Sequence, residues 1–206
     1  MYGLIYRPRL STSSASADKH NSLGASLMAI PPTDFTFLAE ANSKQWLDAV
    51  LMQGERCVVA LNALRIRCDS EELRRASNTM RVEEHFFVIA LGKAMDWLSE
   101  FAQLQTAYRP AIERYLSQLP HARDVRNMRE HDIEYFKGEG RRQPNFVHKH
   151  TDENGQVLAQ SDGSSTVVFG DKYLIGGRLD LNGVLRISKD LSLSLRIKRK
   201  KGPGSD

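Results

Sequence analysis

The chain has 206 residues, 41% of them apolar and 26% charged, with a formal net charge of +4 at pH 7. This length can bury one sizeable core and does not require two. The segment 196–206 alone accounts for the whole net charge, so the residues before it are neutral overall. This balance gives no support for a broadly basic protein that binds nucleic acid tightly and without sequence preference.

No apolar run approaches the roughly 20 residues that a membrane-spanning helix needs, so we expect no membrane association. Cys57 and Cys68 fall on nearly one face of a helix and are too far apart to form a disulfide within it. We expect them to be small buried residues of a cytoplasmic protein. The sequence contains no cluster of metal ligands, and we expect neither a metal nor a cofactor.

The first 40 residues differ in composition from the rest of the chain. Residues 1–17 contain two arginines and many serines but no acidic residue, which is typical of an organelle-targeting segment. No convincing amphipathic stripe accompanies this composition, and Met28 offers an alternative start. We interpret residues 1–40 as a mostly disordered N-terminal segment.

Helical periodicity begins after this segment. Asn42 and Ser43 can cap a first helix that extends to about Arg67 and carries apolar residues every three or four positions. Because Asp69 and Glu72 resemble a capping box, a short helix is expected to follow them.

Three further helices are predicted downstream. Residues 77–79 offer a break, after which a long helix over residues 80–105 has a broad apolar face. A third helix occupies residues 110–119, where a proline suits its first turn and another proline ends it. A fourth helix, residues 122–136, is expected to run without interruption until Gly138.

Four helices with short connections predict a mainly α fold, an antiparallel up-and-down bundle over residues 41–140. Residues 141–198 are expected to form a small C-terminal β appendage, and residues 199–206 a basic disordered tail.

Within the appendage, short strands are predicted at residues 156–160, 165–169 and 172–175. His148 and His150 are expected in a solvated loop. Residues 179–198 fit either the alternation of a strand or the apolar face of a helix, and we favour a C-terminal strand or a frayed helix.

The fourth helix carries the only pattern that indicates chemistry. Arginine precedes histidine by four to six intervening residues at four places in the chain, and Pro120 or Pro144 interrupts three of them. Only Arg126 and His131 are free of such a breaker, and the polar Asn127 directly follows the arginine. An arginine can neutralise a phosphate while an imidazole moves protons near neutral pH.

This pattern resembles the Arg-polar-x3-His motif of the HEPN superfamily of helical bundles. The resemblance implies a dimeric, metal-independent endoribonuclease of a toxin–antitoxin or phage-defence system, in which Arg126 and His131 of two protomers line a cleft. Its partners would be RNA and a cognate antitoxin protein. In one HEPN subgroup a modified tyrosine lies two positions after the histidine, where this chain has Ile133. Regulation by nucleotide transfer is therefore not implied.

Helix geometry supports the site only in part. Asp124, Asn127 and His131 share one helix edge, whereas Arg126 lies roughly 140° from the histidine. A second protomer or a bent arginine side chain must complete the site. The alternative is structural, with Arg126 paired to Glu130.

Other residues are assigned supporting roles. Glu84 of the second long helix is expected to orient His131 or bind Arg126, although such a residue is more often exposed. Tyr135, one turn after His131, borders the site. The candidate RNA contacts are Arg123, Arg129 and Lys137.

Two functions remain open at this point. In the first, His131 exchanges a proton with the RNA while Arg126 stabilises charge on the phosphate oxygens. In the second, the chain is a non-catalytic helical module that binds a protein partner. The neutral body and the lack of further catalytic groups favour the second function.

Overall fold

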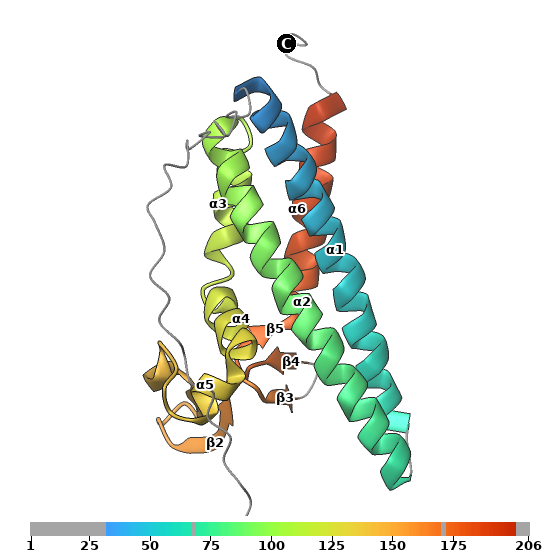
Figure 1. Ribbon diagram of the computed structural model, residues 1–206, viewed down its shortest axis with the longest axis vertical. Coiled ribbons are helices and arrows are strands. Elements are labelled where there is room, and N and C mark those ends of the chain that lie inside the picture. Colours follow the sequence, from blue (N-terminus) through green and yellow to red (C-terminus); the bar gives the residue numbers. More distant parts are fainter. Residues whose placement is uncertain (1–31, 67–68, 170–171, 201–206) are drawn as a thin grey trace, which may run out of the picture. The chain divides into compact units, whose positions relative to one another are not determined.

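The computed structural model describes residues 32–66, 69–169 and 172–200, all within one compact unit. Figure 1 shows long packed helices together with short strands near one end of the helical part. The predicted fold class, a mainly α bundle with a small β appendage, is confirmed. Among the helices that can be described, none is long and apolar enough to span a membrane.

Helix α1, Pro32–Ile66, begins ten residues before the predicted cap. Asn42 and Ser43 lie inside it, where the Asn42 amide donates to the Leu38 carbonyl at 2.9 Å and Ser43 is buried. The true start has a proline at its first position and Asp34 in the first turn, both favourable for a helix N-terminus. The predicted disorder is therefore wrong from residue 32 onward, and residues 1–31 lie outside the described part.

Helix α2, Ser70–Leu104, is continuous where a break was predicted. Asp69 caps it by accepting a 2.7 Å hydrogen bond from the Glu72 amide. Thr79 does not cap a new helix, because its hydroxyl donates to the Arg75 carbonyl at 3.0 Å and is satisfied within the same helix. Helices α1 and α2 pack side by side along much of their length (Figure 1).

Three short helices follow. Helix α3, Arg109–Ser117, has the expected proline in its first turn. The fourth predicted helix is divided in two: α4, Ala122–Glu130, ends before His131, and α5, Asp132–Phe136, begins after it.

In the part of the chain that the structure describes, the strands form two separate antiparallel sheets. Strands β1, Val147–Thr151, and β2, Val157–Asp162, form a hairpin. Strands β3, Thr166–Phe169, β4, Lys172–Ile175, and β5, Leu179–Asp180, form the second sheet in that order. The three predicted strands are present, but His148 and His150 lie in β1 rather than in a loop. A single 3₁₀ turn, Gln143–Asn145, precedes the first hairpin.

Helix α6, Leu181–Lys200, corrects the predicted C-terminal appendage. It packs against α1 and α3 as a member of the bundle, and the Tyr115 and Ser188 hydroxyls share a 3.0 Å hydrogen bond. Within residues 179–198, which fitted a strand or a helix, Leu179 and Asp180 form a short strand and the residues from Leu181 onward form a helix. The predicted disordered tail overlaps the end of α6, and residues 201–206 lie outside the described part.

The main core lies among α1, α2, α3, α6 and the β4–β5 sheet. Its large buried side chains include Leu47, Phe87, Leu91, Leu98, Phe101, Ile112 and Tyr173. A second, small cluster of Met128, Tyr135 and Phe146 joins α4 and α5 to the segment before β1. Cys57 is buried as expected, and Cys68 lies outside the described residues.

Candidate functional site

The break between α4 and α5 determines which side chains of the predicted site are exposed to solvent and which are buried. His131 leaves the helical conformation, with φ −121° and ψ 34°, while its amide still donates to the Asn127 carbonyl at 3.1 Å. The next helix starts at once, and in its first turn the Asp132 carboxylate accepts from the Ile133 amide at 2.8 Å. The break allows Tyr135 to enter the second core cluster while the His131 side chain stays half exposed. The expectation of an uninterrupted helix is therefore wrong.

Arg126 is held by two carboxylates. Its Nε donates to Glu130 at 2.8 Å, and its Nη1 lies 3.5 Å from Asp96 on α2. The side chain lies across Gly92, where a Cβ atom would collide with the arginine Cδ. The pairing with Glu130 that was considered as a structural alternative is thus present.

His131 does not join Arg126 within one chain. Its Nδ1 lies 3.5 Å from Glu134, the ion-pair partner of the imidazole when it is protonated. Arg126 and His131 therefore face separate carboxylates, and a single chain does not assemble them into one site.

The predicted supporting residues hold the local fold together. The Asn127 amide donates to the Tyr135 hydroxyl at 2.8 Å, and this oxygen also accepts from the Arg142 backbone at 3.2 Å. Asp124 forms an ion pair with the Arg142 guanidinium. These contacts tie α4 to α5 and to the following loop, and Tyr135 borders this junction from inside the protein.

The three predicted RNA contacts differ in their surroundings. Arg123 is exposed and pairs with Asp96 at 3.0 Å. Lys137 is exposed just after α5. Arg129 is buried, because its side chain points into the protein and pairs with Glu84 at 2.8 Å. Only Arg123 and Lys137 are displayed to solvent.

Glu84 is the centre of a buried polar network that sequence reasoning largely missed. It contacts α4 through Arg129, rather than through Arg126 or His131, and its side chain is fully buried rather than exposed. The Thr166 hydroxyl lies 2.7 Å and 2.8 Å from its two oxygens, and the Tyr173 hydroxyl donates to it. A sequence signal existed: Glu84 shares a helix face with Phe87 and other buried residues of α2.

The charge of Glu84 affects its neighbours. Burial and the nearby carboxylates of Glu84 and Glu83 raise the pKa of the Cys57 thiol to about 12. Burial and Glu84 also raise the pKa of the Tyr173 phenol above its ordinary value. Both groups stay protonated at neutral pH, so Cys57 is not a thiolate nucleophile.

A separate group of imidazoles lies on the first hairpin. His150 Nε2 and the buried Ser161 hydroxyl share a 2.9 Å hydrogen bond, and the rings of His148 and His150 are 4.8 Å apart. Partial burial, and then the positive charges of Arg178, His150 and His121, lower the pKa of His148. Among the described residues, no group of three or more His, Cys, Asp or Glu side chains could hold a metal ion.

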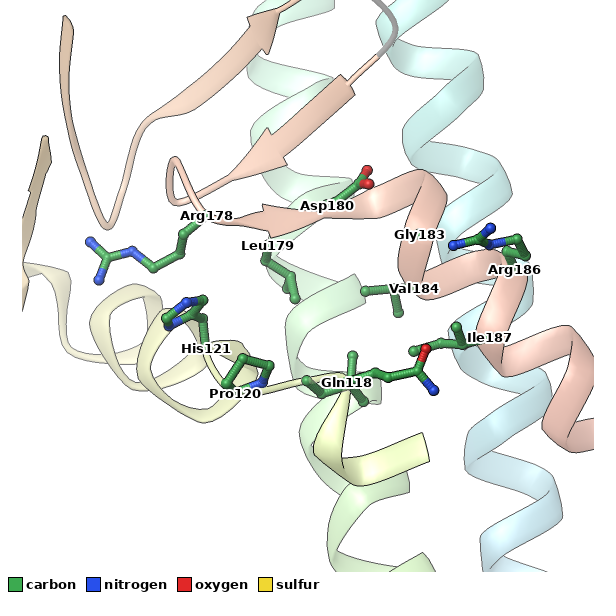
Figure 2. A pocket seen from close by; sticks show the side chains of 11 residues that line it. Gln118, Pro120, His121, Arg178, Leu179, Asp180, Gly183, Val184, Arg186 and Ile187 are labelled. Carbon is green, nitrogen blue, oxygen red and sulfur yellow. The ribbon is translucent and has the colours of Figure 1, made fainter. Parts of the chain in front are cut away.

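A pocket of about 250 Å³ lies between the α3–α4 connection and the first turns of α6. Figure 2 shows Arg178 and His121 at one end of it and Arg186 at the other, with Asp180 pointing away. Asp180 instead caps α6 by accepting from the Asn182 amide at 3.2 Å. These charged groups do not converge on one point, so the pocket offers no set of catalytic groups.

Comparisons with protein-family models, with curated proteins and with solved structures find no match to this chain.

Proposed function

We propose that the chain is a metal-independent endoribonuclease that acts as a homodimer, of the kind found in toxin–antitoxin or phage-defence systems. One observation carries the proposal. The helix that bears Arg126 ends at His131, which leaves the imidazole half exposed five residues after the arginine. Phosphodiester cleavage without a metal requires at least an accessible imidazole and an arginine that reach the same phosphate, which here needs a second copy of the chain.

The reaction uses a ribose 2′-hydroxyl of the RNA as nucleophile. Neutral His131 accepts its proton while the 2′-oxygen bonds to the adjacent phosphorus and the bond to the 5′-oxygen breaks. Arg126 neutralises charge that develops on the other phosphate oxygens. The protonated His131 of the second protomer donates a proton to the departing 5′-oxygen, so the products are a cyclic phosphate and a free 5′-hydroxyl.

A dimer is required because one chain separates the two groups. Arg126 is partly neutralised by Asp96 and Glu130, and His131 faces Glu134. A symmetric pair of protomers would bring α4 and α5 of each into one cleft, where the RNA phosphate replaces Glu130 as the arginine's partner. We expect a dimer in sedimentation at micromolar concentration, and a monomer there would contradict the proposal.

The direct test is cleavage of structured and unstructured RNA in the presence of a chelator. His131→Ala and Arg126→Ala should each lower the rate by roughly 10²–10⁴-fold. The matched controls are His148→Ala on β1 and Arg114→Ala on the exposed side of α3, which should cleave at the wild-type rate. Cleavage that stops in chelator, or that persists in His131→Ala, would reject this mechanism.

A second candidate function is a non-catalytic module that binds a protein partner. It is favoured by an exposed apolar stripe on α1, where Met52, Val59 and Ile66 are spaced seven residues apart and are 52–75% exposed. The stripe lies roughly 200° around the helix from buried Val50 and Cys57. Val59→Glu should abolish co-purification of a protein partner, whereas His131→Ala should leave it unchanged, and no variant or wild-type protein should cleave RNA.

A further inference from the structure

A second pocket, of about 210 Å³, lies where α2, α5 and the β2–β3 turn meet. Its cationic or protonatable lining residues are Arg81 and His85 of α2 and Arg129 of α4, and its other lining residues are Asp132, Phe136 and Ser164. This pocket is distinct from the one in Figure 2 and shares no residue with it.

Arg129 lines this pocket, but its side chain is largely committed to the interior of the protein. The side chain is 6% exposed and its Nη2 is fully used by Glu84, the Ser165 carbonyl and the Thr166 hydroxyl. Its Nε is buried and has no hydrogen-bond partner. Because this Nε has almost no accessible surface, it is not a contact atom for a ligand in the pocket, and Arg129 contributes to the pocket as part of its wall.

Arg81 adds a charge that is not neutralised. It is exposed and forms no hydrogen bond or ion pair with any residue that the structure describes. Arg81 and His85 are four residues apart on one edge of α2, and both line the pocket. Because the charge of Arg129 is balanced by Glu84, the free positive charge comes from Arg81, joined by His85 when that ring is protonated.

The rim of the pocket is fixed by the β2–β3 turn. The Ser164 amide and hydroxyl both donate to Asp162, at 2.9 Å and 2.6 Å. Burial alone would raise the pKa of Asp162, but hydrogen bonds from Ser164 and Ser165 outweigh it and lower the pKa. Asp162 is therefore ionised near neutral pH and holds Ser164 in place at the pocket.

Phe136 gives the pocket an aromatic side. Its ring is 62% exposed and meets the buried Phe146 ring edge to face, with 5.6 Å between centroids. An exposed aromatic ring beside cationic groups is the combination that binds single-stranded nucleic acid, because the ring stacks a base and the cations bind its phosphate.

We propose that this pocket binds one phosphate of a single-stranded RNA, through Arg81 and His85, with a neighbouring base stacked on Phe136. The choice of RNA as the source of the phosphate rests on the proposed ribonuclease function. Asp132, which lines the pocket, directly follows His131 in the chain.

The test is binding of a fluorescein-labelled 2′-O-methyl RNA decamer, which lacks the nucleophilic 2′-hydroxyl and cannot be cleaved. Arg81→Gln should weaken binding about tenfold or more, and it should reduce the salt-dependence slope by about 0.7. Phe136→Ala should weaken binding roughly 5- to 100-fold. Arg114→Gln on α3 and Leu193→Ala on α6 are the matched exposed controls and should bind as the wild type does.

A variant that is expected to strengthen RNA binding separates an effect on the binding site from damage to the fold, because damage would only weaken binding. Asp132 is the one carboxylate that lines the pocket and it repels a phosphate. Asp132→Asn should therefore strengthen decamer binding about two- to fivefold. The asparagine oxygen can still accept from the Ile133 amide, so α5 is expected to keep its start.

The outcomes distinguish the two proposals. Decamer binding that is absent, or indifferent to Arg81, Phe136 and Asp132, would overturn the phosphate site even if the protein cleaves RNA. Binding that depends on these residues without any RNA cleavage would support the site and reject the ribonuclease. If inorganic phosphate or a mononucleotide binds as tightly as the decamer, the assignment to an RNA chain is overturned.

Discussion

The carboxylate of Glu84 and the guanidinium of Arg129 form a buried ion pair of 2.8 Å that joins α2 to α4. Thr166 and Tyr173 extend this pair to strands β3 and β4. The network therefore holds α4, the helix that bears Arg126, against both α2 and the second sheet.

Breaking this ion pair should destabilise the protein strongly. Glu84→Gln and Arg129→Met should each lower the free energy of unfolding by about 3–5 kcal/mol, because each leaves a buried partner without its counter-charge. The double variant should lose less than the sum of the two, since no lone charge then remains buried. Urea denaturation measures all three, with the exposed Glu71→Gln as the control. Losses below about 1 kcal/mol in both single variants would contradict the buried pair.

Gly92→Ala tests the placement of Arg126 without changing that arginine. A Cβ at position 92 would collide with the Arg126 side chain, which can move away because it is long and partly exposed. We expect stability within about 1 kcal/mol of the wild type, since alanine favours the helix. RNA cleavage in chelator should fall nearly as far as in Arg126→Ala. Unchanged cleavage would show that the observed position of Arg126 does not matter for the reaction.

Stability should depend on pH through His148. The folded pKa of this imidazole is lowered, so the unfolded chain binds the proton more readily. The contribution of His148 to stability is fully present above the unfolded pKa, near 6.5, and is lost as the pH falls below that value. Thermal melting between pH 5 and 8 should show this loss, and His148→Gln should reduce it. A variant whose melting profile keeps the full wild-type slope below pH 6.5 would rule out His148 as its source.

Cys57 should resist thiol reagents in the folded protein. Its pKa is raised to about 12 and its side chain is buried, so little thiolate is present or accessible at pH 8. In a Cys68→Ser background, we expect a chromogenic disulfide reagent to label Cys57 slowly, at the rate of protein opening. Urea should then restore full labelling. Rapid reaction without denaturant would contradict the buried, protonated state.

The sequence determined much of the architecture because helical periodicity is a local signal. Apolar spacing along α1 and α2 and the proline in α3 all pointed to a helical bundle, and turn residues marked the three predicted strands of the small sheets. The positions at which the helices begin and end were less well determined by the sequence. Thr79 has the side chain of a cap, yet tertiary packing keeps α2 continuous and the hydroxyl bonds within the helix.

Tertiary structure alone decided the C-terminal helix and the surroundings of the candidate site. Residues 179–198 fitted two periodicities, and the contacts with α1 and α3 select the helix from Leu181 onward. The motif containing Arg126 and His131 was visible in the sequence, whereas the break at His131 arises where Tyr135 enters a separate core cluster. Glu84 and Arg129 are 45 positions apart, and only folding makes them partners, because a charge can be buried only beside an opposite charge.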